Sequence, residues 1–131
     1  MPQIQKLTPN LIVSDVERSL AFYRDVLGFA VEATVPDAAP YVFAAVHAGP
    51  VTIFLNAPEP AIAEYPAFKG RPIGGTLTLF IEVAGIREAY EALRSRVTIT
   101  MPLEKKGYGV TEFAFEDPDG YVMTFAEREH E

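Results

Sequence analysis

The spacing of apolar residues predicts a strand and then a helix at the start of the chain. Residues 3–13 alternate between apolar and polar side chains, which is typical of a strand with one buried face. Apolar residues then recur at helical spacing over 16–27, where the inward stripe is Val16, Leu20, Tyr23 and Leu27. Ser14 and Glu17 predict a capping box, in which each side chain accepts a hydrogen bond from a backbone N–H at the start of the helix. Gly28 can adopt the left-handed conformation that ends a helix.

Three short strands and a connector complete the first half. Residues 29–35, 41–47 and 51–56 are rich in apolar side chains, and the turns between them contain proline and glycine. Residues 57–75 hold the prolines and glycines Pro58, Pro60, Pro66, Gly70, Pro72, Gly74 and Gly75. Because these residues interrupt regular structure, we interpret this segment as a connector without a helix or strand of its own.

The second half repeats the same order of elements. Residues 76–83 alternate like the first strand, and 86–96 carry a helical pattern. The inward positions of this helix are Ile86, Ala89, Tyr90 and Leu93. Strands follow near 98–102 and over 109–116 and 121–127.

The two halves align with each other at a constant offset. Val13 aligns with Val83 (83 − 13 = 70), and a duplicated module explains both this offset and the shared order of elements. We therefore predict an α+β fold of two tandem βαβββ modules, which form a cupped mixed sheet with the helices outside. The predicted organisation is a single domain over 1–131, with modules at 1–56 and 76–131 and the connector at 57–75.

Side chains that alternate with the helix-packing positions should line a cleft between the modules. In the strands that open and close each module, these are Thr8, Asn10, Phe54, Thr78, Phe80 and Thr124. The same offset pairs Thr8 with Thr78 (78 − 8 = 70) and Phe54 with Thr124 (124 − 54 = 70). Four positions related in this way are a natural place for a metal, but threonine and phenylalanine are not usual ligands of a divalent ion.

Aromatic and acidic side chains are further candidates for a binding site. Phe43, Phe54, Phe80 and Tyr108 could form a lining that stacks on a flat ligand, or could belong to the core. We expect Glu112 to face a ligand or the rim of the cleft, with a solvent-facing strand position as the alternative. Glu82 and Glu112 could also form a general acid–base pair, although Glu82 is expected at a strand end in solvent.

The two histidines do not predict a site of their own. His47 lies near the end of a strand, where we interpret it as a surface or rim residue. His130 lies in the charged tail. Neither histidine position indicates a catalytic Ser-His-Asp triad.

Composition narrows the classes of partner. The chain has 49% hydrophobic residues and no cysteine, which excludes disulfides and thiolate metal sites. Its net charge of −7 disfavours nucleic acid as a partner and attracts a cationic small molecule. Without a signal peptide, or an apolar run near the ~20 residues that cross a bilayer, we expect a cytoplasmic protein with no membrane partner.

Two stretches carry a family resemblance. Residues 13–23, VSDVERSLAFY, together with Leu27, Gly28 and Phe29, resemble the first module of the glyoxalase/bleomycin-resistance/dioxygenase superfamily, the vicinal oxygen chelate fold. Residues 108–120, YGVTEFAFEDPDG, resemble its closing hairpin in the form seen in bleomycin-resistance-type members. The resemblance covers nearly the whole chain, but its motifs mostly encode caps, packing and turns.

The resemblance also implies where a metal would bind. Metalloenzymes of this superfamily use His, Gln or Glu at the four paired cleft positions, which correspond here to Thr8, Phe54, Thr78 and Thr124. We therefore expect no metal ligands, no cofactor and no catalytic residues. What remains is the metal-free branch, which the resemblance implies sequesters drugs in a cleft at the interface of a homodimer.

The function predicted from the sequence is metal-independent binding of a small antibiotic-like molecule, cationic as one option. The predicted ligand-binding residues are Thr8, Asn10, Phe43, Phe54, Thr78, Phe80, Tyr108, Glu112 and Thr124. One alternative is a metal-dependent lyase, isomerase or dioxygenase with non-standard ligands such as Glu82, Glu112 or His47. A metal-free enzyme that uses the cleft carboxylates is another.

Overall fold

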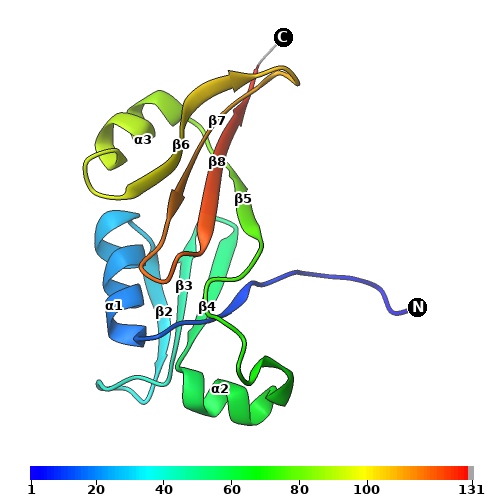
Figure 1. The fold of residues 1–131 in the computed structure, drawn as a ribbon, viewed down its shortest axis with the longest axis vertical. Coiled ribbons are helices and arrows are strands. Elements are labelled where there is room, and N and C mark those ends of the chain that lie inside the picture. The colour runs from blue at the N-terminus through cyan, green and yellow to red at the C-terminus, as the bar shows by residue number, and fades with distance from the viewer. Residues whose placement is uncertain (130–131) are drawn as a thin grey trace. The chain divides into compact units, whose positions relative to one another are not determined.

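The structure is a computed structural model that describes residues 1–129, and its elements form two compact units (Figure 1). One unit covers Met1–Ile73 and the other begins at Gly74. Each contains a four-stranded mixed sheet, and the order strand, helix and three strands occurs in both. The predicted α+β fold of βαβββ modules is therefore confirmed. In the described part of the chain, no helix is long and apolar enough to cross a membrane.

The first unit packs one helix on one face of its sheet. Its elements are β1 (Asn10–Ile12), α1 (Val16–Ala21), β2 (Ala30–Val35), β3 (Phe43–Ala48) and β4 (Val51–Asn56). The strands lie in the order β1-β4-β3-β2, with β1 parallel to β4 and the other neighbours antiparallel. Buried between α1 and the sheet are Val13, Val16, Tyr23, Val46, Ile53 and Leu55. The helical stripe predicted from the sequence therefore supplies this core.

The start of α1 differs from the predicted capping box. Asp15, not Ser14, is the N-cap, and its Oδ1 accepts a hydrogen bond of 3.1 Å from the backbone N–H of Arg18. The Glu17 carboxylate instead accepts a hydrogen bond from the backbone N–H of Tyr41. The predicted Ser14–Glu17 reciprocity is thus wrong, because a distant loop offers Glu17 a partner that the local sequence does not show.

The end of the same helix agrees with the sequence. α1 continues into a π-helical turn over Phe22–Val26, and Gly28 follows with a φ of 78°, the left-handed conformation expected there. The ring of Tyr23 lies edge-on to that of Phe29, with 5.8 Å between ring centroids. This contact packs the end of the helix against the residue that precedes β2.

The first strand is much shorter than the predicted 3–13. β1 has one strand neighbour, β4, and their ladder covers Asn10–Ile12 against Phe54–Asn56. Leu7, which was expected on the buried face, is 82% exposed. Alternation in the sequence describes which face a residue would occupy, but the length of a strand depends on how much neighbouring strand is available.

The predicted connector contains helical structure. Pro58–Glu64 form α2, and Pro66–Phe68 form a short 3-10 turn. Pro58 is the first residue of α2, where a backbone N–H has no helical partner, so its missing N–H costs nothing there. The expectation that 57–75 holds no element is therefore wrong, because proline breaks a helix only beyond its first turn.

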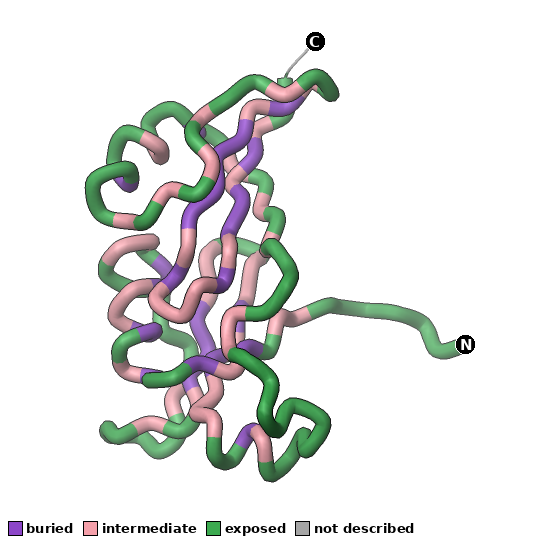
Figure 2. Tube along the Cα trace, in the orientation of Figure 1, coloured by how far each residue is buried: buried purple, intermediate pink, exposed green. Residues whose placement is uncertain are grey.

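The second unit has the same arrangement around an aromatic core. Its elements are β5 (Thr78–Glu82), α3 (Ile86–Leu93), β6 (Thr98–Lys106), β7 (Val110–Glu116) and β8 (Val122–Arg128), with the strands in the order β5-β8-β7-β6. β6 extends beyond the predicted 98–102, while α3 ends before residue 96. Figure 2 shows buried positions along β7 and β8. Tyr90 of α3 packs edge-on against Phe113, with 5.1 Å between ring centroids.

Candidate functional site

The strand register of the second unit defines the sheet face opposite α3. Phe80 pairs with Thr124, and Thr124 pairs with Ala114. Residues paired across neighbouring strands project to the same face, and Phe113, one residue before Ala114, contacts α3. The face opposite α3 therefore carries Thr78, Phe80, Glu82, Glu112, Ala114, Thr124 and Ala126. This set includes four of the residues predicted to bind a ligand.

Thr78 and Thr124 lie side by side on this face. Their hydroxyl oxygens are 2.7 Å apart and form a hydrogen bond. Thr124 is buried, whereas Thr78 lies on the outermost strand, β5, and is exposed. The two hydroxyls are therefore bonded to each other, and both are neutral groups.

Glu112 is a buried carboxylate on the same face. It is 4% exposed, so the alternative of a solvent-facing strand position is wrong. The hydroxyl of Tyr108, in the turn between β6 and β7, donates a hydrogen bond to Oε2 of Glu112. This hydrogen bond, the partial loss of water around the phenol and the charge of Glu112 raise the pKa of Tyr108 above its usual value.

Glu82 and Glu112 do not form a carboxylate pair. The register places Ala126 of β8 between them, which separates their backbones by roughly 10 Å, or two strand spacings. Glu82 forms an ion pair with Arg128, and its side chain is 56% exposed. Since each carboxylate has its own partner, the geometry gives no support to a shared proton between them.

The face opposite α1 in the first unit carries three more of the predicted residues. Phe54 pairs with Asn10 and with Ala45, and Phe43 pairs with Asn56. The rings of Phe43 and Phe54 meet edge-on, with centroids 5.2 Å apart. Both rings are half-buried, so they leave apolar surface that a ligand could cover. Thr8 precedes β1 and is also half-buried.

The amide of Asn56, which the sequence analysis did not select, is hydrogen-bonded to Asn10. Its Nδ2 donates to Oδ1 of Asn10 at 2.6 Å and to the carbonyl oxygen of Leu11 at 3.1 Å. Asn56 alternates with the apolar residues of β4 in the same way as Phe54. This alternation in the sequence could therefore have predicted that Asn56 lies on the same face as Phe54.

His47 offers little support for a metal centre. It lies on β3, half-buried, and pairs with Thr52 and Ala30. Within residues 1–129, no three His, Cys, Asp or Glu side chains gather closely enough to hold a metal ion. His130 lies outside the described residues.

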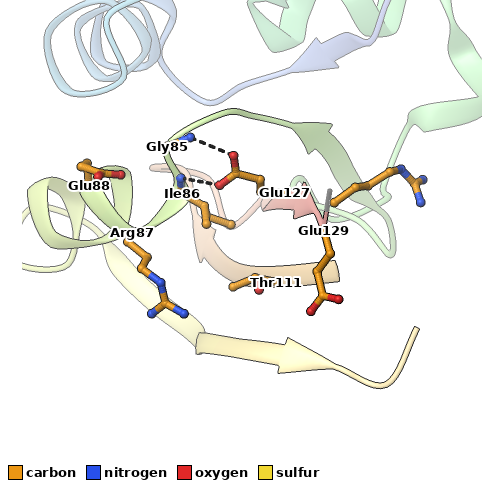
Figure 3. Close-up of a pocket in the computed structure, with 8 residues that line it drawn as sticks. Gly85, Ile86, Arg87, Glu88, Thr111, Glu127 and Glu129 are labelled. Carbon is orange, nitrogen blue, oxygen red and sulfur yellow. Dashed lines mark hydrogen bonds between the residues drawn. The ribbon is translucent and has the colours of Figure 1, made fainter. Parts of the chain in front are cut away.

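One cavity lies at the start of α3 and contains none of the predicted site residues. It has a volume of about 420 Å³ and is lined by Gly85, Ile86, Arg87, Glu88, Thr111, Glu127, Arg128 and Glu129. Figure 3 shows the Glu127 carboxylate turned toward the backbone of Gly85 and Ile86, whose N–H groups donate to it at 3.2 and 3.1 Å. The Glu127 carboxylate thus satisfies two backbone N–H groups at the start of α3, whose N-cap residue is Gly85.

The second cavity lies in the first unit and includes Asn10. Its volume is about 290 Å³, and its lining is Asn10, Ile12, Asn56, Ala61, Tyr65 and Phe68. Three of these residues, Ala61, Tyr65 and Phe68, lie in 57–75, the segment predicted to be a connector. Tyr65 and Phe68 were therefore missed, because their position depends on the turn after α2.

Comparison with known proteins agrees with this architecture. The family model described as the Glyoxalase/Bleomycin resistance protein/Dioxygenase superfamily matches residues 3–125. The chain belongs to this superfamily. No curated protein matched the chain.

Several solved structures share the fold of this superfamily member. A superfamily member from Sphaerobacter thermophilus is 29% identical, with a TM-score of 0.74 over 95% of this chain and 98% of that one. A protein of unknown function from Agrobacterium tumefaciens is 23% identical, with a TM-score of 0.80 over 98% of both chains. A glyoxalase/bleomycin resistance protein/dioxygenase from Nocardioides is 23% identical, with a TM-score of 0.77 over 98% of this chain and 85% of that one.

The positions at which the family resemblance implies a metal do not fit one. Thr78 and Thr124 offer neutral hydroxyls that already bond each other. Phe54 offers no donor atom, and its ring packs on Phe43. Neutral hydroxyls and a phenyl ring are not usual protein ligands of a divalent transition-metal ion.

Proposed function

We propose that this superfamily member binds a small, partly aromatic molecule without using a metal. The observation that carries the proposal is the buried Glu112 carboxylate, which shares a sheet face with the exposed ring of Phe80. A buried negative charge and an apolar ring on the same face, two strands apart, together suit an extended ligand that has an aromatic part and a positive charge.

The hydrogen bonding of Glu112 supports a ligand with a charged donor. A carboxylate has about four acceptor positions, and Glu112 has one hydrogen-bond partner within residues 1–129, the Tyr108 hydroxyl. A cationic N–H group could occupy a remaining position and would be worth more there than in water, because the carboxylate is largely shielded from solvent. The net charge of −7 would attract the same ligand from a distance.

Phe80 supplies the apolar part of the proposed site. Its ring is 49% exposed on β5, and it lies beside Thr124 in the strand register. Covering half of an aromatic side chain would contribute about 2–3 kcal/mol at roughly 25 cal/mol per Å². We propose that Thr78, Tyr108 and Thr124 complete this site. We further propose that Thr8, Asn10, Phe43 and Phe54 bind ligand on the corresponding sheet face of the first unit.

The charge preference is testable by calorimetric titration. The probes are metal-free bleomycin and a set of flat aromatic amines. Each amine is paired with the neutral amide made from it. We expect the cationic member of a pair to bind more tightly, and Glu112→Gln to weaken it about tenfold or more, since a hydrogen bond to a charged group contributes about 1.5–3 kcal/mol.

A matched control separates this contact from the effect of net charge. Glu91→Gln removes the same charge from an exposed position on α3, where Glu91 pairs only loosely with Arg94 at 3.4 Å. This variant should bind the probes like the unmodified protein. Equal weakening by both variants would show that Glu112 does not contact the ligand.

We also propose that the binding form is a homodimer. β2 is an edge strand of its sheet, and its Val35 is 50% exposed, an apolar edge that a second copy could cover. Sedimentation velocity should give twice the mass of the chain, and a monomer at all accessible concentrations would contradict this.

A further inference from the structure

The cavity of the first unit has features of a separate binding site. Two large aromatic side chains, Tyr65 and Phe68, line it and are each 42% exposed. Their ring centroids are 6.2 Å apart at an angle of 70°, so they form two walls that meet at an edge. A volume of about 290 Å³ suits a molecule of one or two rings, at the lower end of ligand pockets.

Backbone hydrogen bonds hold these two walls in place. The N–H of Tyr65 donates to the carbonyl oxygen of Ala61 at 2.8 Å, and the N–H of Phe68 donates to that of Tyr65 at 3.0 Å. Ala61, 7% exposed, forms an apolar floor. The guanidinium of Arg71 lies 5.8 Å from the centroid of the Phe68 ring. The backbone that carries both rings is thus ordered before any ligand arrives, which lowers the entropy cost of binding.

The hydrogen bonds of the two asparagines fix the orientation of both amides. Nδ2 of Asn56 lies 3.1 Å from the carbonyl oxygen of Leu11, which can only accept, so this atom must be the nitrogen. The same nitrogen lies 2.6 Å from Oδ1 of Asn10, so that atom must be the oxygen. Among residues 1–129, the groups of these two amides left without a hydrogen-bond partner are a donor, Nδ2 of Asn10, and an acceptor, Oδ1 of Asn56.

We propose that this cavity binds a planar ring that contains a cyclic amide. Asn10 donates to the C=O of the ring and Asn56 accepts from its adjacent N–H, while Tyr65 and Phe68 cover the ring. The donor and acceptor are neutral and belong to adjacent, mutually bonded side chains, which matches the neighbouring C=O and N–H of a lactam. This inference shares Asn10 with the residues proposed above, but it requires neither Glu112 nor Phe80, which lie in the other unit, so the two proposals can fail separately.

A series of bicyclic probes tests the chemistry of the ligand. The probes are 2-quinolone, N-methyl-2-quinolone and quinoline, titrated into ¹⁵N-labelled protein and followed through the side-chain amide signals of Asn10 and Asn56. We expect 2-quinolone to shift these signals. Loss of the N–H or of the C=O should weaken binding about tenfold, because an asparagine group that the ligand covers would then lack its hydrogen-bond partner. No binding of 2-quinolone, or equal binding of all three probes, would overturn the proposal.

Variants of the pocket test its residues. Asn10→Asp keeps an oxygen that accepts from Asn56 but replaces the donor, so 2-quinolone should bind about tenfold more weakly. Gln5→Glu makes the same chemical change in the exposed N-terminal segment and should leave binding unchanged. Tyr65→Ala should weaken all three probes together, because it removes a wall and not a hydrogen bond. Equal binding by Asn10→Asp and Gln5→Glu would exclude Asn10 from this site.

Discussion

The hydroxyl of Tyr108 and the carboxylate of Glu112 are the pair on which the proposed charge selection depends. The carboxylate is buried in β7, and the phenol reaches it from the adjoining turn. Tyr108 remains 65% exposed, so a ligand could contact its ring while the hydroxyl holds the carboxylate in one orientation. This pair joins a rigid strand position to an accessible aromatic surface.

At this scale, the titration of Tyr108 provides a direct test of the pair. Its folded-state pKa is raised above the unfolded value of about 10, chiefly by the hydrogen bond to Glu112. Its contribution to stability is therefore complete below about pH 10 and is lost as the pH rises through the folded-state pKa. The tyrosinate absorbance of Tyr108, obtained by subtracting the titration of Tyr108→Phe, should appear at lower pH in Glu112→Gln. An unchanged curve would show that the hydrogen bond is absent in solution.

Among the elements, α1 shows how a cap depends on one side chain. The sequence offers two adjacent capping residues, Ser14 and Asp15, and the structure uses the second. The hydroxyl of Ser14 instead accepts a hydrogen bond from the guanidinium of Arg18 at 2.6 Å, in an exposed position. The two residues should therefore contribute unequally to stability.

Substitution of each candidate cap by alanine measures this difference. Asp15→Ala should lower the free energy of unfolding by about 1 kcal/mol, because the N–H of Arg18 loses its acceptor. Ser14→Ala should cost less than about 0.5 kcal/mol, since it breaks an exposed contact. Urea unfolding of the two variants gives both values. A larger loss of unfolding free energy for Ser14→Ala would show that Ser14 caps the helix, as the capping box predicts.

The entry to β5 depends on a glycine at a close backbone approach. Gly74 has a φ of 99°, and a Cβ there would collide with the backbone carbonyl oxygen of Asp119. Gly74→Ala should therefore destabilise the protein by about 1–3 kcal/mol. Its neighbour is the control: a Cβ on Gly75 meets no atom within 4 Å, so Gly75→Ala should change stability by less than about 1 kcal/mol. Equal unfolding midpoints in urea would show that the close approach is not maintained.

At the scale of the whole molecule, superfamily membership leaves binding and catalysis open as classes of function. The family model matches residues 3–125, but the shared features are those of the fold. The residues at the implied metal positions include Phe54 and the hydrogen-bonded threonines of the second unit, Thr78 and Thr124. Metal content therefore separates the proposed binding protein from a metalloenzyme that uses other ligands.

We expect untagged protein, purified without a chelator, to contain less than about a tenth of an equivalent of any transition metal per chain. Elemental analysis by mass spectrometry gives this value. Near-stoichiometric zinc, iron, manganese or nickel would contradict the proposed function. The residues that coordinate the metal would then be sought among Glu82, Glu112 and His47.

Much of the fold could be predicted because it depends on local pattern. The period of apolar residues identified α1, α3 and most strands, and the constant offset identified the repeated module. Alternation also assigned Phe54, Phe80 and Thr124 to the faces opposite the helices. Whether these faces bind a ligand stays a prediction, since periodicity describes where a side chain points and not what it meets.

The sequence by itself determined the type and order of the elements within each βαβββ module, though not α2 between them, and the side of each strand on which a residue lies. Tertiary structure alone decided the length of β1, the acceptor of the Tyr41 N–H, the burial of Glu112 and the pairing of Asn10 with Asn56. The physical reason is the distance along the chain over which each effect acts. Backbone periodicity acts over a few neighbouring residues, whereas the partner of a hydrogen bond and the exclusion of water depend on segments far apart in the chain.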